Sequence, residues 1–137
     1  MDSRLFVGGM LVLVACAQNY ASPTRIMTDA APQTVFECVR QQFGALEYKQ
    51  TSYDTDALRI NGTKIDLKTR RADTQFRRML DKLEVDVSPD ASGQTGLSVT
   101  ARTFAEYTTQ RGPTEVEEKP SSGVKSDAQR LIERCHS

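Results

Sequence analysis

The stretches LEVDV at residues 83–87 and LSVTA at residues 97–101 alternate apolar and polar residues without interruption. Successive side chains of a strand point to opposite faces, so each stretch predicts a strand with one buried and one wetted face. Between them, PDASG at residues 89–93 has the composition of a turn. The three segments together predict an antiparallel hairpin.

Helices are predicted on both sides of this hairpin. Upstream, Thr34 is followed three residues later by Glu37, the pattern of a capping box, and apolar residues then recur every three or four positions. This predicts a helix over residues 34–44, ended by Gly44. Downstream, the apolar residues of 124–135 share one helical face, and Ser121 or Ser122 is the expected N-cap.

Two further strands are expected between the first helix and the hairpin. One opens at residues 46–48, and the other covers 55–69 with a slip of its apolar parity at Asn61-Gly62. That pair fits either a bulge or a tight hairpin turn, and the bulge is favoured. Residues 70–78 are expected to be a basic connection and residues 110–123 a loop rich in glycine and proline.

The order helix, four strands, helix predicts an α+β fold over residues 33–137. Elements with one apolar side each close a core most simply as a two-layer sandwich. We therefore expect an antiparallel four-stranded sheet that carries the N-terminal and the C-terminal helix on one face. A length of 137 residues fits this single domain with short appendages.

The charges of the chain disfavour nucleic acid as a partner, because the formal net charge is zero. Locally, residues 59–82 carry eight basic and three acidic residues, whereas residues 84–118 carry seven acidic and two basic ones. Adjacent surpluses of opposite sign are expected to pair across neighbouring strands.

The N-terminus has the features of an export signal. Residues 5–15 form an apolar run after one basic residue, Arg4, and the run is too short to cross a bilayer as a helix. It ends in LVAC at residues 13–16, which resembles the lipobox of bacterial lipoproteins. The remainder of the chain resembles small uncharacterised envelope lipoproteins, a similarity that implies no activity.

This resemblance implies that residues 1–15 are a signal peptide and that Cys16 is lipidated and becomes the mature N-terminus. The lipid on Cys16 would hold the protein on a membrane, and residues 16–32 are interpreted as a flexible tether. Ala17 after the cysteine favours the periplasmic face of the outer membrane, by similarity to enterobacterial lipoproteins. Cleavage after Ala17 is the alternative, and it would release a soluble periplasmic or secreted protein.

With Cys16 lipidated, Cys38 and Cys135 remain, each on the apolar stripe of a terminal helix. In an oxidising compartment these two thiols predict a disulfide between the helices. Two separate buried thiols are the alternative. A metal site that adds His136 lacks the four suitably spaced ligands of zinc, so no metal is expected.

The sequence offers weak candidates for catalysis. His136, the sole histidine, lies next to the C-terminus, where a general base is poorly held. Two pairs of carboxylates, at residues 84 and 86 and at residues 117 and 118, lack the apolar surroundings of an acid catalyst. Contacts to phosphate or carboxylate groups are possible for four arginines, Arg70, Arg71, Arg77 and Arg78, as is a merely solubilising role.

These observations predict a non-enzymatic, lipid-anchored module of the cell envelope that needs no cofactor. Its partner is expected to be an envelope protein or polymer that meets the exposed sheet face or the arginine-rich loop. Two alternatives remain open at this point: a thiol- or carboxylate-dependent envelope hydrolase, and a structural spacer of an outer-membrane assembly.

Overall fold

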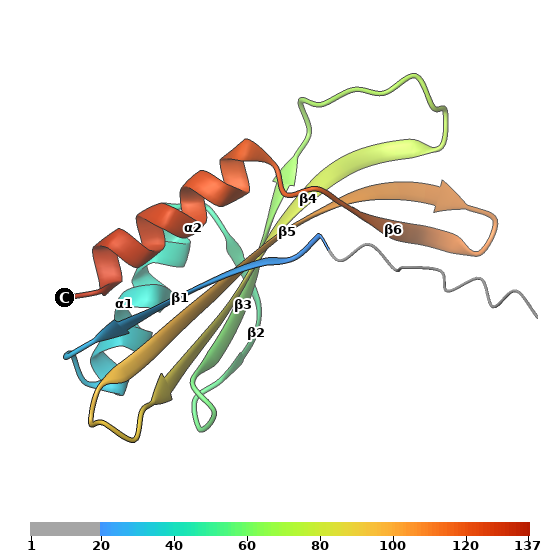
Figure 1. Cartoon of the computed structure of the whole chain (residues 1–137). Coiled ribbons are helices and arrows are strands. Elements are labelled where there is room, and N and C mark those ends of the chain that lie inside the picture. Colours follow the sequence, from blue (N-terminus) through green and yellow to red (C-terminus); the bar gives the residue numbers. More distant parts are fainter. Residues whose placement is uncertain (1–19) are drawn as a thin grey trace, which may run out of the picture.

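The computed structural model describes residues 20–137, so the predicted signal peptide, Cys16 and the start of the predicted tether lie outside the described residues. Within this part no helix combines the length and the apolar character needed to span a membrane. Figure 1 shows the elements in chain order, which are β1 Ser22–Thr28, α1 Pro32–Ala45, β2 Lys49–Asp54, β3 Arg59–Asp66, β4 Phe76–Pro89, β5 Thr95–Thr109, β6 Gly112–Glu118 and α2 Ser122–Cys135.

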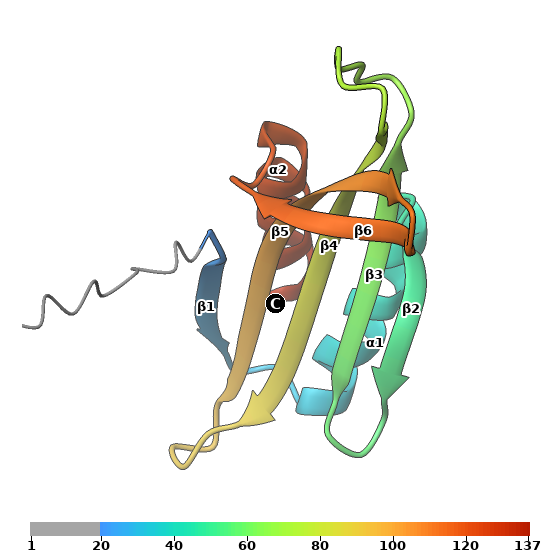
Figure 2. The same ribbon diagram turned by 90° about the vertical axis from the view of Figure 1, so that its right-hand side faces the viewer.

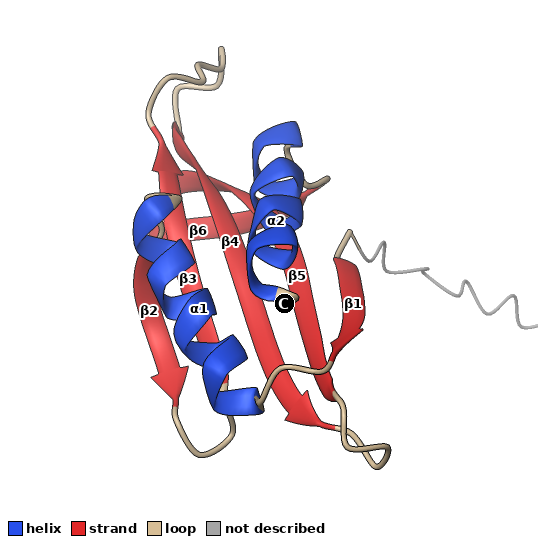
Figure 3. Cartoon of the chain, turned by 90° about the vertical axis from the view of Figure 1, so that its left-hand side faces the viewer, coloured by secondary structure: helices blue, strands red, loops and turns tan. Residues whose placement is uncertain are grey.

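The strands form one antiparallel sheet in the order β1-β5-β4-β3-β2, and β6 pairs with the distal half of β5 beyond β1. The predicted hairpin is β4–β5, with Val85 opposite Val99. Both helices cover the same face of the sheet (Figure 3). The α+β class is therefore confirmed, as is the placement of the helices, but the sheet has six strands and not four.

The two strands that the sequence analysis missed pair with the same edge of β5. The predicted flexible tether is wrong for Ser22–Thr28, which form β1 and lie opposite Thr95–Ala101. The loop predicted for residues 110–123 is wrong for Gly112–Glu118, which form β6. Neither segment alternates apolar and polar residues, and each contains a proline. Their strand conformation comes from hydrogen bonds to β5, whose fifteen residues present a long edge.

The apparent parity slip at Asn61-Gly62 is neither a bulge of this strand nor a hairpin turn. β3 runs through both residues in unbroken register with β4. The register shift lies on the neighbouring strand, between Gln50 and Ser52 of β2. The parity slips in the sequence because Gly62 occupies a helix-side position, while Ile65 lies on the other face and is 48% exposed.

The start of α1 differs from the prediction. The helix begins at Pro32, with Ala31 as an N-cap that makes no side-chain hydrogen bond, so the capping box of Thr34 and Glu37 is absent. Proline has no N–H to leave unpaired and is well suited to the first helical turn. The cap of α2 is as predicted: Ser121 Oγ accepts a 3.1 Å hydrogen bond from the amide of Val124.

The core lies between the helices and the sheet, where seventeen buried residues form one cluster. The opposite face carries ion pairs between strands. Arg59 Nε lies 2.6 Å from Asp86 Oδ1, and Lys82 Nζ lies 2.6 Å from Glu115 Oε2. Figure 2 shows this face, with β6 crossing in front of β4 and β5. The predicted pairing of the two charge surpluses is therefore confirmed.

Candidate functional site

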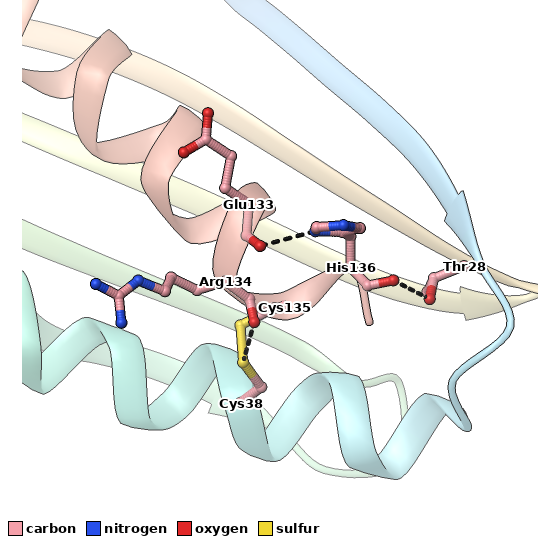
Figure 4. The surroundings of a disulfide bond; sticks show 6 residues. All are labelled: Thr28, Cys38, Glu133, Arg134, Cys135 and His136. Carbon is pink, nitrogen blue, oxygen red and sulfur yellow. Dashed lines mark hydrogen bonds between the residues drawn. A yellow bond between two sulfur atoms is a disulfide. The ribbon is translucent and has the colours of Figure 1, made fainter.

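The predicted disulfide joins the two helices. Cys38 of α1 and Cys135 of α2 are bonded at 2.02 Å between their sulfur atoms, with 5.7 Å between their Cα atoms. Figure 4 shows the bridge beside the C-terminal end of α2. Neither cysteine offers a thiolate for nucleophilic chemistry while this bond stands.

His136 is held at the end of α2 by hydrogen bonds to two other residues of the protein. Its Nδ1 lies 2.7 Å from the carbonyl oxygen of Glu133 and must therefore carry the proton. Its own carbonyl accepts a hydrogen bond from the hydroxyl of Thr28, at the end of β1 (Figure 4). The residue thus ties the C-terminal end of α2 to the C-terminal end of β1.

The four candidate arginines do not converge on one site. Arg71 makes two hydrogen bonds to Glu118, of 2.5 and 2.6 Å, and Arg78 Nε lies 3.1 Å from Glu106 Oε1. Arg77 Nε lies 3.9 Å from the same Glu106 atom. Arg70 is exposed on the loop before β4. Carboxylates of the protein thus already engage the guanidinium groups of Arg71 and Arg78.

The two carboxylate pairs of the sequence are also matched by arginines. Arg102 Nε lies 3.2 Å from Glu84 Oε2, and Arg102 Nη1 lies 2.9 Å from Glu117 Oε1. Asp86 pairs with Arg59, and Glu118 pairs with Arg71. The hydrogen bonds from Arg71 lower the pKa of Glu118 below its ordinary value. A general acid needs the opposite shift, so this geometry favours a structural role for Glu118.

A buried polar cluster that the sequence analysis missed lies between α2 and the sheet. Tyr48 donates a 2.9 Å hydrogen bond to Asp127 Oδ2, and Lys64 Nζ lies 3.4 Å from the same oxygen. Burial raises the pKa of Tyr48, and the negative charge of Asp127 raises it further. The signal was Asp127 itself, a carboxylate within the apolar stripe of the predicted helix.

A second polar cluster fixes the start of α2. Thr103 Oγ1 and Ser121 Oγ donate hydrogen bonds of 2.6 and 3.0 Å to Asp81. The amide of Ser121 in turn donates to Thr103 Oγ1 at 2.9 Å. Among residues 20–137, every buried side-chain nitrogen or oxygen has a hydrogen-bond partner. Both clusters therefore have the closed bonding of structural networks.

An apolar hollow of the described surface lies between β1 and α2, and we call it the β1–α2 groove. Its volume is about 450 Å³, within the range of small ligand sites. The apolar part of its lining consists of Ile26, Ala101, Ala128 and Ile132. Polar side chains complete the lining, namely Thr24, Lys125, Gln129 and Glu133.

The groove exists because the helices do not cover the whole sheet. α2 packs on β5 and β4, whereas β1, at the end of the strand order, has no helix above it (Figure 3). Ala101 and Ala128 are small, so the space between strand and helix is not filled by side chains. Ile132 is half-buried: it packs against the core, as its periodicity predicted, and it also lines the groove.

Comparison with known family models and with curated proteins finds no match to this chain. Two charged side chains, Lys125 and Glu133, stand on the same helix eight positions apart, on either side of the apolar part. Such a lining suits non-covalent binding of an apolar group flanked by charge or hydrogen-bonding groups.

Proposed function

We propose that this protein is a lipid-anchored binding module of the bacterial cell envelope, held on a membrane through Cys16 and binding its partner in the β1–α2 groove. The observation that carries the proposal is an open apolar groove in a domain whose polar clusters are internally bonded. The partner is an envelope protein or polymer, and the outer membrane is the proposed location.

Three features support this proposal together. The lipobox at residues 13–16 is typical of proteins that are exported and anchored by a lipid. The disulfide between Cys38 and Cys135 suits an oxidising compartment. The groove gives a surface that water wets poorly and that a ligand can cover. Arginine pairing on the opposite sheet face makes that face less suited to a charged polymer than the sequence suggested.

The anchor is tested by expressing the full chain in a bacterium that processes lipoproteins. Intact mass of the purified wild type should show a chain that begins at Cys16 and carries acyl groups, and the protein should fractionate with outer membranes. The Cys16→Ser variant should lose both the added mass and the membrane association. A wild-type mass that begins at Gln18, with the protein in the soluble fraction, would establish the soluble alternative.

The groove is tested with an environment-sensitive dye, anilinonaphthalene sulfonate, on the folded protein. Ile132→Glu places a charge in the groove and should weaken dye binding by about tenfold, because it removes buried apolar contact. Ile65→Glu is the matched control, since it makes the same change at an exposed isoleucine on the opposite face. Equal dye binding by both variants would contradict a binding role for the groove.

A further inference from the structure

β1 is an edge strand of the sheet. Within residues 20–137, β1 pairs with β5 on one side and with no strand on the other. In an antiparallel pair, alternate residues turn their N–H and C=O groups away from the partner. An edge of this kind is a template for one more strand. Pro23 cannot donate a hydrogen bond there, so the usable part of the edge is residues 24–28.

The β1–α2 groove lies directly beside this edge, on the helix side of the sheet. Thr24 and Ile26 line it, and they stand opposite the buried residues Val99 and Leu97 of β5. An added strand would lie roughly 4.8 Å outside β1, and every second side chain would point into the groove, roughly 6.7 Å from the next. The part of α2 from Lys125 to Glu133 is roughly 12 Å long. It therefore accommodates two such side chains.

Charge sets the direction of such a segment. The hydrogen bond between Thr28 and His136 places the C-terminal end of α2 beside the C-terminal end of β1, so the two elements run in the same direction. Glu133 therefore lies toward Thr28 and Lys125 toward Thr24. A strand antiparallel to β1, as elsewhere in this sheet, would bring its N-terminal part to Glu133 and its C-terminal part to Lys125. It should carry a basic residue first and an acidic residue last.

We propose that the partner contributes an extended polypeptide segment that adds to the outer edge of β1 as a further antiparallel strand and places two alternate apolar side chains in the β1–α2 groove. This inference rests on the proposed function and specifies its partner. Backbone hydrogen bonds to β1 would supply affinity, while the groove and its two charged residues would supply sequence preference.

The test measures binding of short peptides to the purified mature protein by fluorescence anisotropy. The probe is the labelled peptide Lys-Thr-Ile-Thr-Ile-Thr-Glu, and its charge-reversed form Glu-Thr-Ile-Thr-Ile-Thr-Lys is the first control. The probe should bind at least about fivefold more tightly than the reversed peptide. Ile132→Glu should weaken probe binding by about tenfold, and Ile65→Glu should leave it unchanged.

Two further peptides test whether the backbone is used. Each keeps the side chains of the probe but carries N-methyl groups on every second amide, one peptide on each parity. Strand addition uses the amides of one side, so one methylated peptide should lose binding and the other should retain it. Binding that survives both methylations, or is lost with both, overturns strand addition. Dye that fills the groove while no peptide binds also overturns this inference and leaves the binding role of the groove standing.

Discussion

The hydroxyl of Tyr48 donates a 2.9 Å hydrogen bond to Asp127 Oδ2 and so joins the residue just before β2 to the middle of α2. Lys64 of β3 approaches the same oxygen and also lies 5.4 Å from the centre of the Tyr48 ring. One buried carboxylate thereby links two strands at the far side of the sheet to the helix that borders the groove. The position of α2 depends on this contact as well as on apolar packing.

Replacement of Tyr48 by phenylalanine should lower the free energy of unfolding by about 1–2 kcal/mol, because Asp127 loses one of its two partners in a buried setting. Urea denaturation followed by circular dichroism measures the change. Tyr53→Phe is the control, since Tyr53 is 50% exposed and should shift stability by less than about 0.5 kcal/mol. Equal effects at the two tyrosines would show that the hydrogen bond to Asp127 contributes nothing.

A side chain at Gly62 should destabilise the domain, because α1 approaches β3 closely there. A Cβ atom at this position would lie 2.8 Å from Cε2 of Phe43 and 3.2 Å from Cβ of Tyr48. Gly62→Ala should cost about 1–3 kcal/mol through displaced core side chains. Gly44→Ala is the matched control within α1: an added Cβ meets nothing within 4 Å, and alanine should stabilise the helix by about 0.5–1 kcal/mol. Thermal unfolding midpoints that move in opposite directions would support both statements.

The pair of Arg71 and Glu118 should make stability depend on pH in the acid range. Hydrogen bonds from Arg71 lower the pKa of Glu118 in the folded state, so the unfolded state binds the proton more readily. The contribution is therefore fully present above the unfolded pKa of about 4.3 and is lost as pH falls through the lower folded value. Both side chains are about one-third exposed, which limits the effect to under about 1 kcal/mol.

Denaturation of wild type and Glu118→Gln between pH 6 and pH 3 measures this contribution. The variant should lose less stability over the interval than the wild type. Arg71→Gln should flatten the profile equally, and the double variant should match either single one, because both remove the same interaction. Additive effects of the two substitutions would refute the assignment of the shift to this pair.

Loss of the disulfide should remove much of the stability of this domain. The bridge closes a loop of 97 residues, for which the chain-entropy model gives about 4–5 kcal/mol. In a Cys16→Ser background, the double variant Cys38→Ser/Cys135→Ser should unfold at a markedly lower urea concentration. Reductant should bring the Cys16→Ser protein with its disulfide intact to the midpoint of the double variant and leave the latter unchanged. An unchanged midpoint under reduction would contradict the prediction.

Elements that bury their own apolar side could be predicted from the sequence. The hairpin β4–β5 and the helix α2 carry the periodicity of their structures, and the stripes of the two helices brought Cys38 and Cys135 together correctly. The strands β1 and β6 could not be predicted in this way. In β6, Glu115 pairs with Lys82 and Glu117 pairs with Arg102. The strand conformation of β6 is therefore stabilised by residues that are distant in the chain.

The candidate site was beyond local sequence reasoning for the same reason. The β1–α2 groove needs β1 as its wall, and the segment SPTRIMT at residues 22–28 has the composition of a linker. The helical period placed Ile132 on the core side of α2 correctly. It could not show that Ile132 also borders a groove, because an apolar stripe does not reveal where the sheet beneath it ends. The buried cluster of Tyr48, Lys64 and Asp127 was easier to predict from the sequence, because Asp127 lies among the apolar positions of α2.

Cys38 and Cys135 are 97 residues apart in the sequence, and this separation determines when their disulfide can form. Synthesis delivers the chain from its N-terminus onward, so the strands β1 to β6 emerge before α2 does. The disulfide can form only after α2 has been made, because α2 carries Cys135. His136, which bonds to Thr28, follows directly after it. The presence of the disulfide therefore shows that the chain has been made at least as far as Cys135.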